Sequence, residues 1–124
     1  MEKKILVIDD EEILTRTLSR LLGKKGYQVT ALTKPEEALS LIEKTDFDLV
    51  LCDIRMPGMN GVETVREMKR IGQAAGKNDF PVIFLTGYAD IKLENEAKAL
   101  QPVAFVFKPF DAFYLLEIIQ TQFT

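Results

Sequence analysis

Blocks of apolar residues recur along the chain with polar segments between them, in the order expected for strands separated by helices. Five short apolar runs have the length of strands, and most are as continuously apolar as a sheet covered on both faces requires. The predicted strands span residues 4–8, 28–32, 49–52, 81–85 and 103–107. The second run mixes polar and apolar residues, so we expect it at an edge of the sheet.

Helical periodicity fills the segments between the predicted strands. The predicted helices span residues 11–22, 33–44, 61–71, 90–100 and 111–123. Gly23 and Gly26 offer left-handed positions that end the first helix. Thr33 and Glu36 have capping-box spacing at the start of the second helix. The polar segment 72–80 is predicted to be a loop on the surface.

Five strands alternating with five helices predict an α/β fold, because the crossover between two parallel strands is long and right-handed. Ligands of such sheets bind beyond the carboxyl ends of the strands. The polar residues that close or follow the apolar runs are Asp9, Asp10, Asp53, Thr86 and Lys108. We therefore expect these five side chains to share one crevice.

Three carboxylates in one crevice repel each other unless a cation bridges them, and hard oxygen ligands favour Mg²⁺. With Thr86 and Lys108 added, the set indicates a site that handles phosphoryl groups. Each residue also has a simpler explanation, which the sequence leaves open. Asp10 suits a helix N-cap and Asp53 a turn. Thr86 suits an ordinary strand, and Lys108 a solvated strand end.

Composition limits the classes of function. The chain has 124 residues, of which 47% are hydrophobic, which fits one domain spanning residues 1–124. A formal net charge of -3 argues against direct binding of nucleic acid. With one cysteine, Cys52, and no histidine, the chain has no internal disulfide and a zinc site is disfavoured. The apolar stretch near the N-terminus is too short for a signal peptide or a membrane span, so we expect a cytoplasmic protein.

Four motifs fall at these strand ends: ILVIDDEE at residues 5–12, LVLCDIRMPGMNG at 49–61, VIFLTGY at 82–88 and FVFKPF at 105–110. With these motifs, and over essentially its whole length, the chain resembles the receiver domains of two-component response regulators. The resemblance implies a flavodoxin-like, doubly wound sheet with strand order 2-1-3-4-5. It also implies a phosphorylation-controlled switch rather than a turnover enzyme.

The resemblance implies a catalytic role for three residues. Asp53 would accept a phosphoryl group from a phosphohistidine on a sensor histidine kinase or phosphotransfer protein, while Lys108 and Thr86 would bind the phosphoryl oxygens. Thr86 and Phe105 would form the switch that repacks the surface of the fourth helix, fifth strand and fifth helix. That surface would control an output domain or a downstream protein, with no direct contact to nucleic acid or membrane.

The resemblance also implies a Mg²⁺ site made by Asp9, Asp10, Asp53 and the backbone carbonyl of Arg55, with Asp9 acting through water. Mg²⁺ prefers an octahedral oxygen shell with retained waters, which this partial set leaves open for a phosphoryl oxygen. By the same resemblance, the side chains of Arg55 and Tyr88 flank the path of the attacking water. Because both are bulky, we expect slow loss of the phosphoryl group.

Three features bear on the output surface or depart from the family pattern. Ala104 and Ile118 stand where charged residues support the family's dimer, so a phosphorylation-dependent homodimer is left open. Apolar residues in the last helix are too numerous for one buried stripe, so we expect Tyr114, Leu116 or Ile118 to reach solvent. The segment 72–80 is longer than the usual connection before the fourth strand.

Other classes of function fit the sequence less well. A hydrolase of the haloacid dehalogenase type would use Asp9 as nucleophile with Glu11 two residues on, but no second acidic pair follows Lys108. A flavin or nucleotide binder needs a phosphate loop where residues 9–12 are all acidic. A scaffold independent of phosphorylation usually lacks an acidic residue or the lysine. Whether the 124 residues are a whole protein or an excised receiver stays open.

Overall fold

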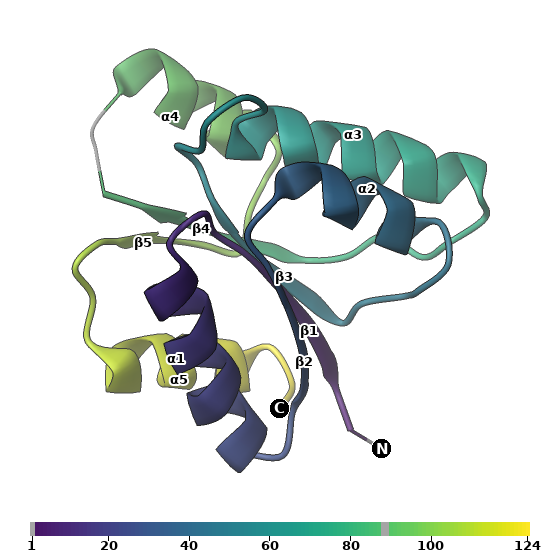
Figure 1. Ribbon diagram of the computed structural model, residues 1–124. Helices are drawn as coiled ribbons and strands as arrows, with labels where there is room; N and C mark the ends of the chain where they lie inside the picture. The colour runs from purple at the N-terminus through teal and green to yellow at the C-terminus, as the bar shows by residue number, and fades with distance from the viewer. Residues whose placement is uncertain (1, 88–89) are drawn as a thin grey trace.

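The computed structural model describes residues 2–87 and 90–124 of the chain. Within these residues, five parallel strands form one sheet in the order β2-β1-β3-β4-β5 (Figure 1). The strands are β1 (Lys4–Ile8), β2 (Gln28–Leu32), β3 (Leu49–Asp53), β4 (Val82–Thr86) and β5 (Ala104–Phe107). The helices are α1 (Glu12–Lys24), α2 (Pro35–Ile42), α3 (Gly61–Ala74), α4 (Ile91–Ala99) and α5 (Ala112–Thr121). The predicted α/β class, strand order and alternation of strands with helices are confirmed, as is the edge position of β2.

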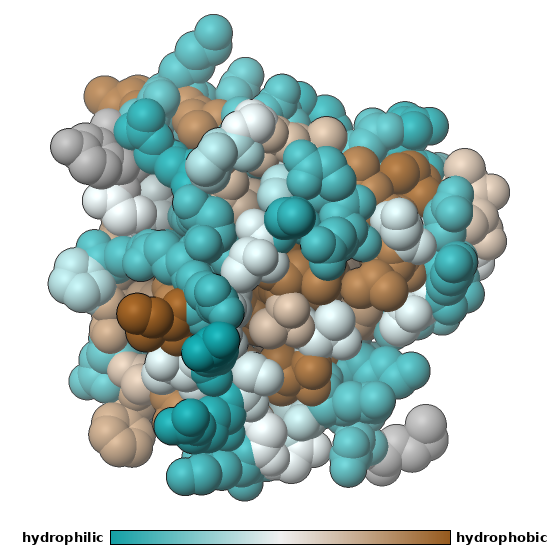
Figure 2. Space-filling model, viewed as in Figure 1, coloured by the Kyte–Doolittle hydropathy of each residue, from teal (hydrophilic) through white to brown (hydrophobic). Residues whose placement is uncertain are grey.

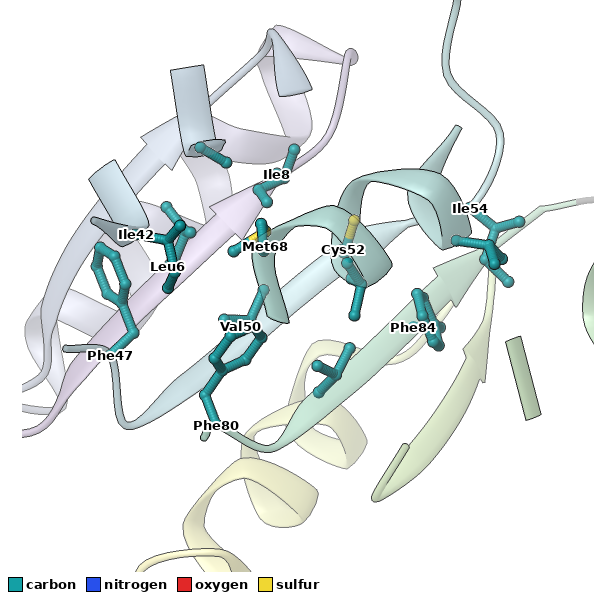
Figure 3. Packing of buried hydrophobic residues seen from close by; sticks show 14 of the residues in the cluster. Leu6, Ile8, Ile42, Phe47, Val50, Cys52, Ile54, Met68, Phe80 and Phe84 are labelled. Carbon is teal, nitrogen blue, oxygen red and sulfur yellow. The ribbon is translucent and has the colours of Figure 1, made fainter. Parts of the chain in front are cut away.

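Two layers of helices enclose the sheet. Helices α1 and α5 cover one face, and α2, α3 and α4 cover the other (Figure 1). Because successive strand residues point to opposite faces, Ile5 and Val7 join the cluster beneath α1 and α5, while Leu6 and Ile8 join the opposite cluster. Figure 3 shows this second cluster, to which α3 contributes Met68. Strand β1 is therefore buried on both faces, next to the central strand β3.

Strand and helix boundaries agree with the predicted ranges to within one to three residues. The main difference is α3, which continues through Gly72 to Ala74, so the loop before β4 is shorter than predicted. A capping box that the sequence analysis missed starts this helix. The Asn60 side chain accepts a hydrogen bond from the Glu63 N–H, and the Glu63 side chain accepts one from the Asn60 N–H. These two bonds satisfy N–H groups that the first turn leaves open.

Two predictions about helix ends are wrong. The N-cap of α2 is Lys34, which makes no side-chain cap bond, so Thr33 and Glu36 form no capping box. The reason is Pro35, whose fixed φ suits the first helical position and moves the cap to the residue before it. Gly23 lies inside α1 and does not end the helix. The left-handed residue is Gly26, at φ 92°.

Apolar side chains reach the surface at scattered places. Figure 2 shows one face of the molecule, on which teal hydrophilic residues divide the brown apolar ones into separate areas. Among the large hydrophobic residues that the structure describes, Ile13 and Phe113 are 82% exposed and Tyr114 is 54% exposed. The expectation that α5 exposes apolar surface is confirmed at Tyr114, whereas Leu116 and Ile118 are partly buried against the core. Within the described ranges, no helix combines the length and apolar character needed to cross a membrane.

Candidate functional site

Four strand ends carry the predicted polar residues to one edge of the sheet. Asp9 follows β1, Asp53 closes β3, Thr86 closes β4 and Lys108 follows β5. Backbone pairing continues past the strand ends, since the Asp9 N–H donates to the Leu32 carbonyl at 3.1 Å and the Lys108 N–H donates to the Thr86 carbonyl at 2.7 Å. The main chain at this edge is therefore held by the sheet itself.

A glycine shapes the turn that follows Asp53. The Gly61 N–H donates to the Ile54 carbonyl at 2.7 Å, and the Ile54 N–H donates to the Leu85 carbonyl at 3.0 Å. A Cβ atom at Gly61 would lie 2.1 Å from the backbone carbonyl oxygen of Asp53, far inside van der Waals contact. The first turn of α3 thus packs directly on the end of β3. Any side chain at Gly61 would displace the backbone that carries Asp53.

The Lys108 ammonium group contacts three carboxylates. Its Nζ lies 2.7 Å from Asp9 Oδ2, 2.9 Å from Glu11 Oε1 and 3.4 Å from Asp53 Oδ2. The Lys108 side chain is 15% exposed, which excludes the simpler explanation of a solvated strand end. Sequence reasoning missed the role of Glu11 here. A glutamate in an acidic run gives no signal that it contacts a lysine 97 residues later.

Burial and mutual repulsion control the ionisation of the site. Burial, and after it the charge of Asp9, raises the pKa of Asp53 from 3.8 to about 6. Burial also raises the pKa of Asp9, although the hydrogen bond from Lys108 opposes this. Burial alone would lower the pKa of Lys108, but its hydrogen bonds to Asp9 and Glu11 outweigh that effect and raise the pKa. The site therefore concentrates negative charge that one lysine balances only in part.

The carboxylates of Asp9, Asp10 and Asp53 form a candidate metal site. Each offers one oxygen, and the three oxygens lie within 4.8 Å of one another. Asp10 is exposed and is not the N-cap of α1, because Glu11 holds that position. The Arg55 backbone N–H also donates to the Asp53 carboxylate, so the Arg55 main chain lies beside the cluster. A set of hard oxygen donors with one solvent-facing member fits Mg²⁺, which keeps several waters when it binds.

The predicted switch residues lie on the neighbouring strands β4 and β5, where Phe105 pairs with Phe84 and not with Thr86. Thr86 is 1% exposed at the end of β4, while Phe105 of β5 is partly buried against the cluster on the α2–α4 side. The centroid of the Phe105 ring lies 5.7 Å from that of Phe84, and the Lys98 ammonium lies 6.0 Å from the Phe105 centroid. The position of Phe105 thus fits both a plain packed aromatic residue and the switch role.

A small cleft opens over the carboxylates and Lys108. Its volume is about 220 Å³, and its lining residues are Asp10, Glu11, Asp53, Arg55, Gly87 and Lys108. Cofactor pockets usually enclose about 300 Å³ or more, so the cleft suits a phosphoryl group better than a flavin or nucleotide. Tyr88, which was expected to flank this opening together with Arg55, lies outside the described residues.

The doubly wound sheet and its acidic, lysine-containing cleft are characteristic of one family. Residues 5–120 match the family model of the response regulator receiver domain. The chain therefore belongs to the response regulator receiver domains, a family of signalling switches in two-component systems rather than classical enzymes.

Curated relatives of different lengths share this similarity. The chain is 34% identical over 111 residues to sporulation initiation phosphotransferase F of Bacillus subtilis, covering 90% of this chain and 86% of that protein. It is 34% identical over 117 residues to the transcriptional regulatory protein FixJ of Bradyrhizobium diazoefficiens, covering 94% of this chain and 55% of that protein. The chain thus spans most of one relative and about half of the other.

Solved structures agree with the fold. A CheY-like receiver domain protein from Methanospirillum hungatei superposes with a TM-score of 0.88 at 28% identity, covering 98% of this chain and 94% of that chain. A response regulator from Burkholderia pseudomallei superposes with a TM-score of 0.81 at 28% identity, covering 97% of this chain and 68% of that chain. That second crystal structure holds a phosphorylated aspartic acid, a calcium ion and citrate.

Proposed function

We propose that Asp53 accepts a phosphoryl group from the phosphohistidine of a sensor histidine kinase or phosphotransfer protein, in a reaction that depends on Mg²⁺. The observation that carries the proposal is the position of Asp53 at the end of β3, 4% exposed, facing the cleft with Lys108 Nζ 3.4 Å from its carboxylate. The similarity to a protein named as a phosphotransferase supports it.

The proposed reaction needs positioning and charge neutralisation more than strong nucleophilicity. An Asp53 carboxylate oxygen forms the new bond to phosphorus while the bond between phosphorus and the histidine nitrogen breaks. A pKa of about 6 leaves most of Asp53 ionised at neutral pH, so the carboxylate is available as the nucleophile. Lys108 neutralises one phosphoryl oxygen, and the Thr86 hydroxyl binds another.

Asp9, Asp10, Asp53 and the backbone carbonyl of Arg55 are the groups that would hold Mg²⁺. When bound, the ion supplies positive charge that screens the carboxylates from the incoming phosphoryl oxygens. Asp9 is 0% exposed and its oxygens accept from Lys108 and from the Glu11 N–H. These contacts support the indirect part in metal binding, through water, that the resemblance implies for Asp9.

The proposed output is a change of the surface formed by α4, β5 and α5. Thr86, drawn toward the phosphoryl group, would leave space that Phe105 enters, which repacks this surface as a two-state element. The exposed apolar residues Ile91, Phe107 and Tyr114 lie on these elements and would meet an output domain, a downstream protein or a second copy. We also propose that residues 1–124 act as one receiver unit in the cytoplasm.

Intact-mass spectrometry with acetyl phosphate tests the proposed chemistry. Wild type should gain one phosphoryl group when Mg²⁺ is present and none in EDTA, while Asp53→Asn should gain none in either condition. Phosphorylation of the Asn variant at the wild-type level would refute the assignment of Asp53.

Sedimentation velocity with beryllofluoride and Mg²⁺ tests the output surface for self-association. Tyr114 is a better probe than Ile118, because Ile118 packs against the core and its substitution would disturb folding. We expect that any association induced by the activator is lost in Tyr114→Glu. An activated Tyr114→Glu protein that associates like wild type would move the output surface elsewhere.

A further inference from the structure

We infer that Glu11 is a positioning residue, which draws the Lys108 ammonium toward Asp9 and Glu11, with only a longer contact to Asp53, until a phosphoryl group arrives. The inference deepens the proposed phosphorylation of Asp53 and rests on it. Three carboxylates compete for one ammonium group, and the two shorter contacts, 2.7 Å and 2.9 Å, go to Asp9 and Glu11. The contact with the proposed phosphoacceptor, Asp53, is the longest, at 3.4 Å.

The two stronger partners of Lys108 differ in how firmly they are held. Asp9 is 0% exposed, and its second oxygen accepts a hydrogen bond from the Glu11 N–H at 2.9 Å. The Glu11 side chain is 62% exposed, lines the cleft and lies 2.9 Å from Nζ. An exposed carboxylate recovers its hydration when it leaves an ion pair, whereas a buried one does not. Glu11 is therefore the partner that Lys108 can exchange for a phosphoryl oxygen.

The backbone role of Glu11 is separate from this contact. Glu11 is the N-cap residue of α1, but its side chain makes no cap hydrogen bond. Replacement of the side chain by Gln or Asp therefore weakens the ion pair with Lys108 without removing a cap from the helix. The consequence is a rate effect: in wild type the ammonium must leave Glu11 before it can stabilise the charge on the transferring phosphoryl group, so loss of Glu11 should speed phosphorylation.

The adjacent residue supplies a matched control. Glu12 carries the same charge and is similarly exposed, but it pairs with Arg16 at 2.7 Å and not with Lys108. Glu12→Gln removes one negative charge from the same turn and leaves Lys108 in place. Glu11→Asp keeps the charge and shortens the side chain by one methylene group, which draws the carboxylate back from Nζ.

The first measurement is the rate of Asp53 labelling by acetyl phosphate with Mg²⁺, followed by intact mass. In this reaction an Asp53 oxygen forms the new bond to phosphorus, the bond to the acetyl oxygen breaks, and acetate leaves. Glu11→Gln and Glu11→Asp should each label about threefold faster or more, and Glu12→Gln at the wild-type rate. Unchanged or slower labelling of Glu11→Gln overturns the inference. An equal gain in Glu12→Gln, or a wild-type rate in Glu11→Asp, overturns it as well, because charge alone would then set the rate.

The second measurement does not depend on phosphorylation. The ¹⁵N-edited NMR signal of the Lys108 ammonium protons, assigned with Lys108→Arg, should exchange with water at the same rate in wild type and Glu12→Gln and faster in Glu11→Gln and Glu11→Asp, in which only Asp9 remains as a close partner. If the signal is the same in all four proteins, Glu11 does not hold Lys108. If wild type shows this contact but never labels, the proposed phosphorylation fails while the contact itself stands.

Discussion

The buried carboxylates of the site lie on backbone that is fixed by the sheet, whereas the exposed ones lie on a connecting segment. Asp9 and Asp53 are 0% and 4% exposed, and both lie on backbone that pairs within the sheet. Asp10 and Glu11 are exposed on the connection between β1 and α1. The buried pair cannot move away from its own repulsion, so it depends on a counter-charge. The exposed pair can exchange partners, so a change in its contacts can alter the charge of the site with little loss of folding stability.

The largest expected effect comes from removing the counter-charge of the buried pair. Lys108→Met leaves Asp9 and Asp53 without their cation, and should lower the free energy of unfolding by about 3 kcal/mol at neutral pH. The control is Arg16→Met, which breaks an exposed pair with Glu12 and should cost less than about 1 kcal/mol. Urea unfolding in EDTA measures both. If both variants lost the same free energy of unfolding, the buried carboxylates would depend on their counter-charge no more than the exposed ones do.

The raised pKa of Asp53 predicts how stability depends on pH without metal. The pKa is about 6 in the folded protein and 3.8 ordinarily, so the folded state binds the proton more tightly than the unfolded state does. Stability is therefore lost as pH rises from about 4 to about 6, by roughly 2 to 3 kcal/mol relative to Asp53→Asn. Urea unfolding of both proteins across this range, in EDTA, gives the difference. If the stability of wild type and of Asp53→Asn depended on pH in the same way, the raised pKa of Asp53 would be contradicted.

Metal binding should produce a smaller effect that depends on an exposed carboxylate. Millimolar Mg²⁺ should raise the melting temperature by about 5 °C through preferential binding to the folded state. Asp10→Asn should weaken this response while leaving the metal-free protein at least as stable, because it removes one repelling charge. Thermal unfolding with Mg²⁺ and with EDTA compares the two proteins. Absence of any Mg²⁺ effect on wild type would refute the metal site.

Much of the fold could be predicted from sequence because strands in a covered sheet are continuous apolar runs. Strand β1 was predicted to the residue, and β3 and β4 to within one, since polar residues follow directly on buried ones. The grouping of Asp9, Asp53, Thr86 and Lys108 at one edge followed from the rule that parallel strands end together. The helix ends were less predictable, because the cap of α2 depends on the geometry imposed by Pro35 and not on the Thr33 side chain.

The contact between Glu11 and Lys108 could not be predicted in this way. It joins two side chains from distant parts of the chain, and no period or motif relates them. The close approach of Gly61 to the Asp53 carbonyl was hidden for a similar reason, since only the packed structure shows what a Cβ atom would meet. Sequence patterns give the positions of backbone elements, whereas the partners of individual side chains depend on how those elements pack.

The residue that carries the phosphoryl group can be identified by chemical reduction. The protein is first labelled with acetyl phosphate and Mg²⁺. Borohydride then reduces the acyl phosphate, which turns the phosphorylated aspartate into homoserine. Tandem mass spectrometry identifies the position of the homoserine. If Asp53 is the phosphoacceptor, homoserine should be found at position 53 and at no other acidic residue of the site. Homoserine at position 9 would contradict it and favour a hydrolase with Asp9 as nucleophile, although both oxygens of Asp9 accept hydrogen bonds here.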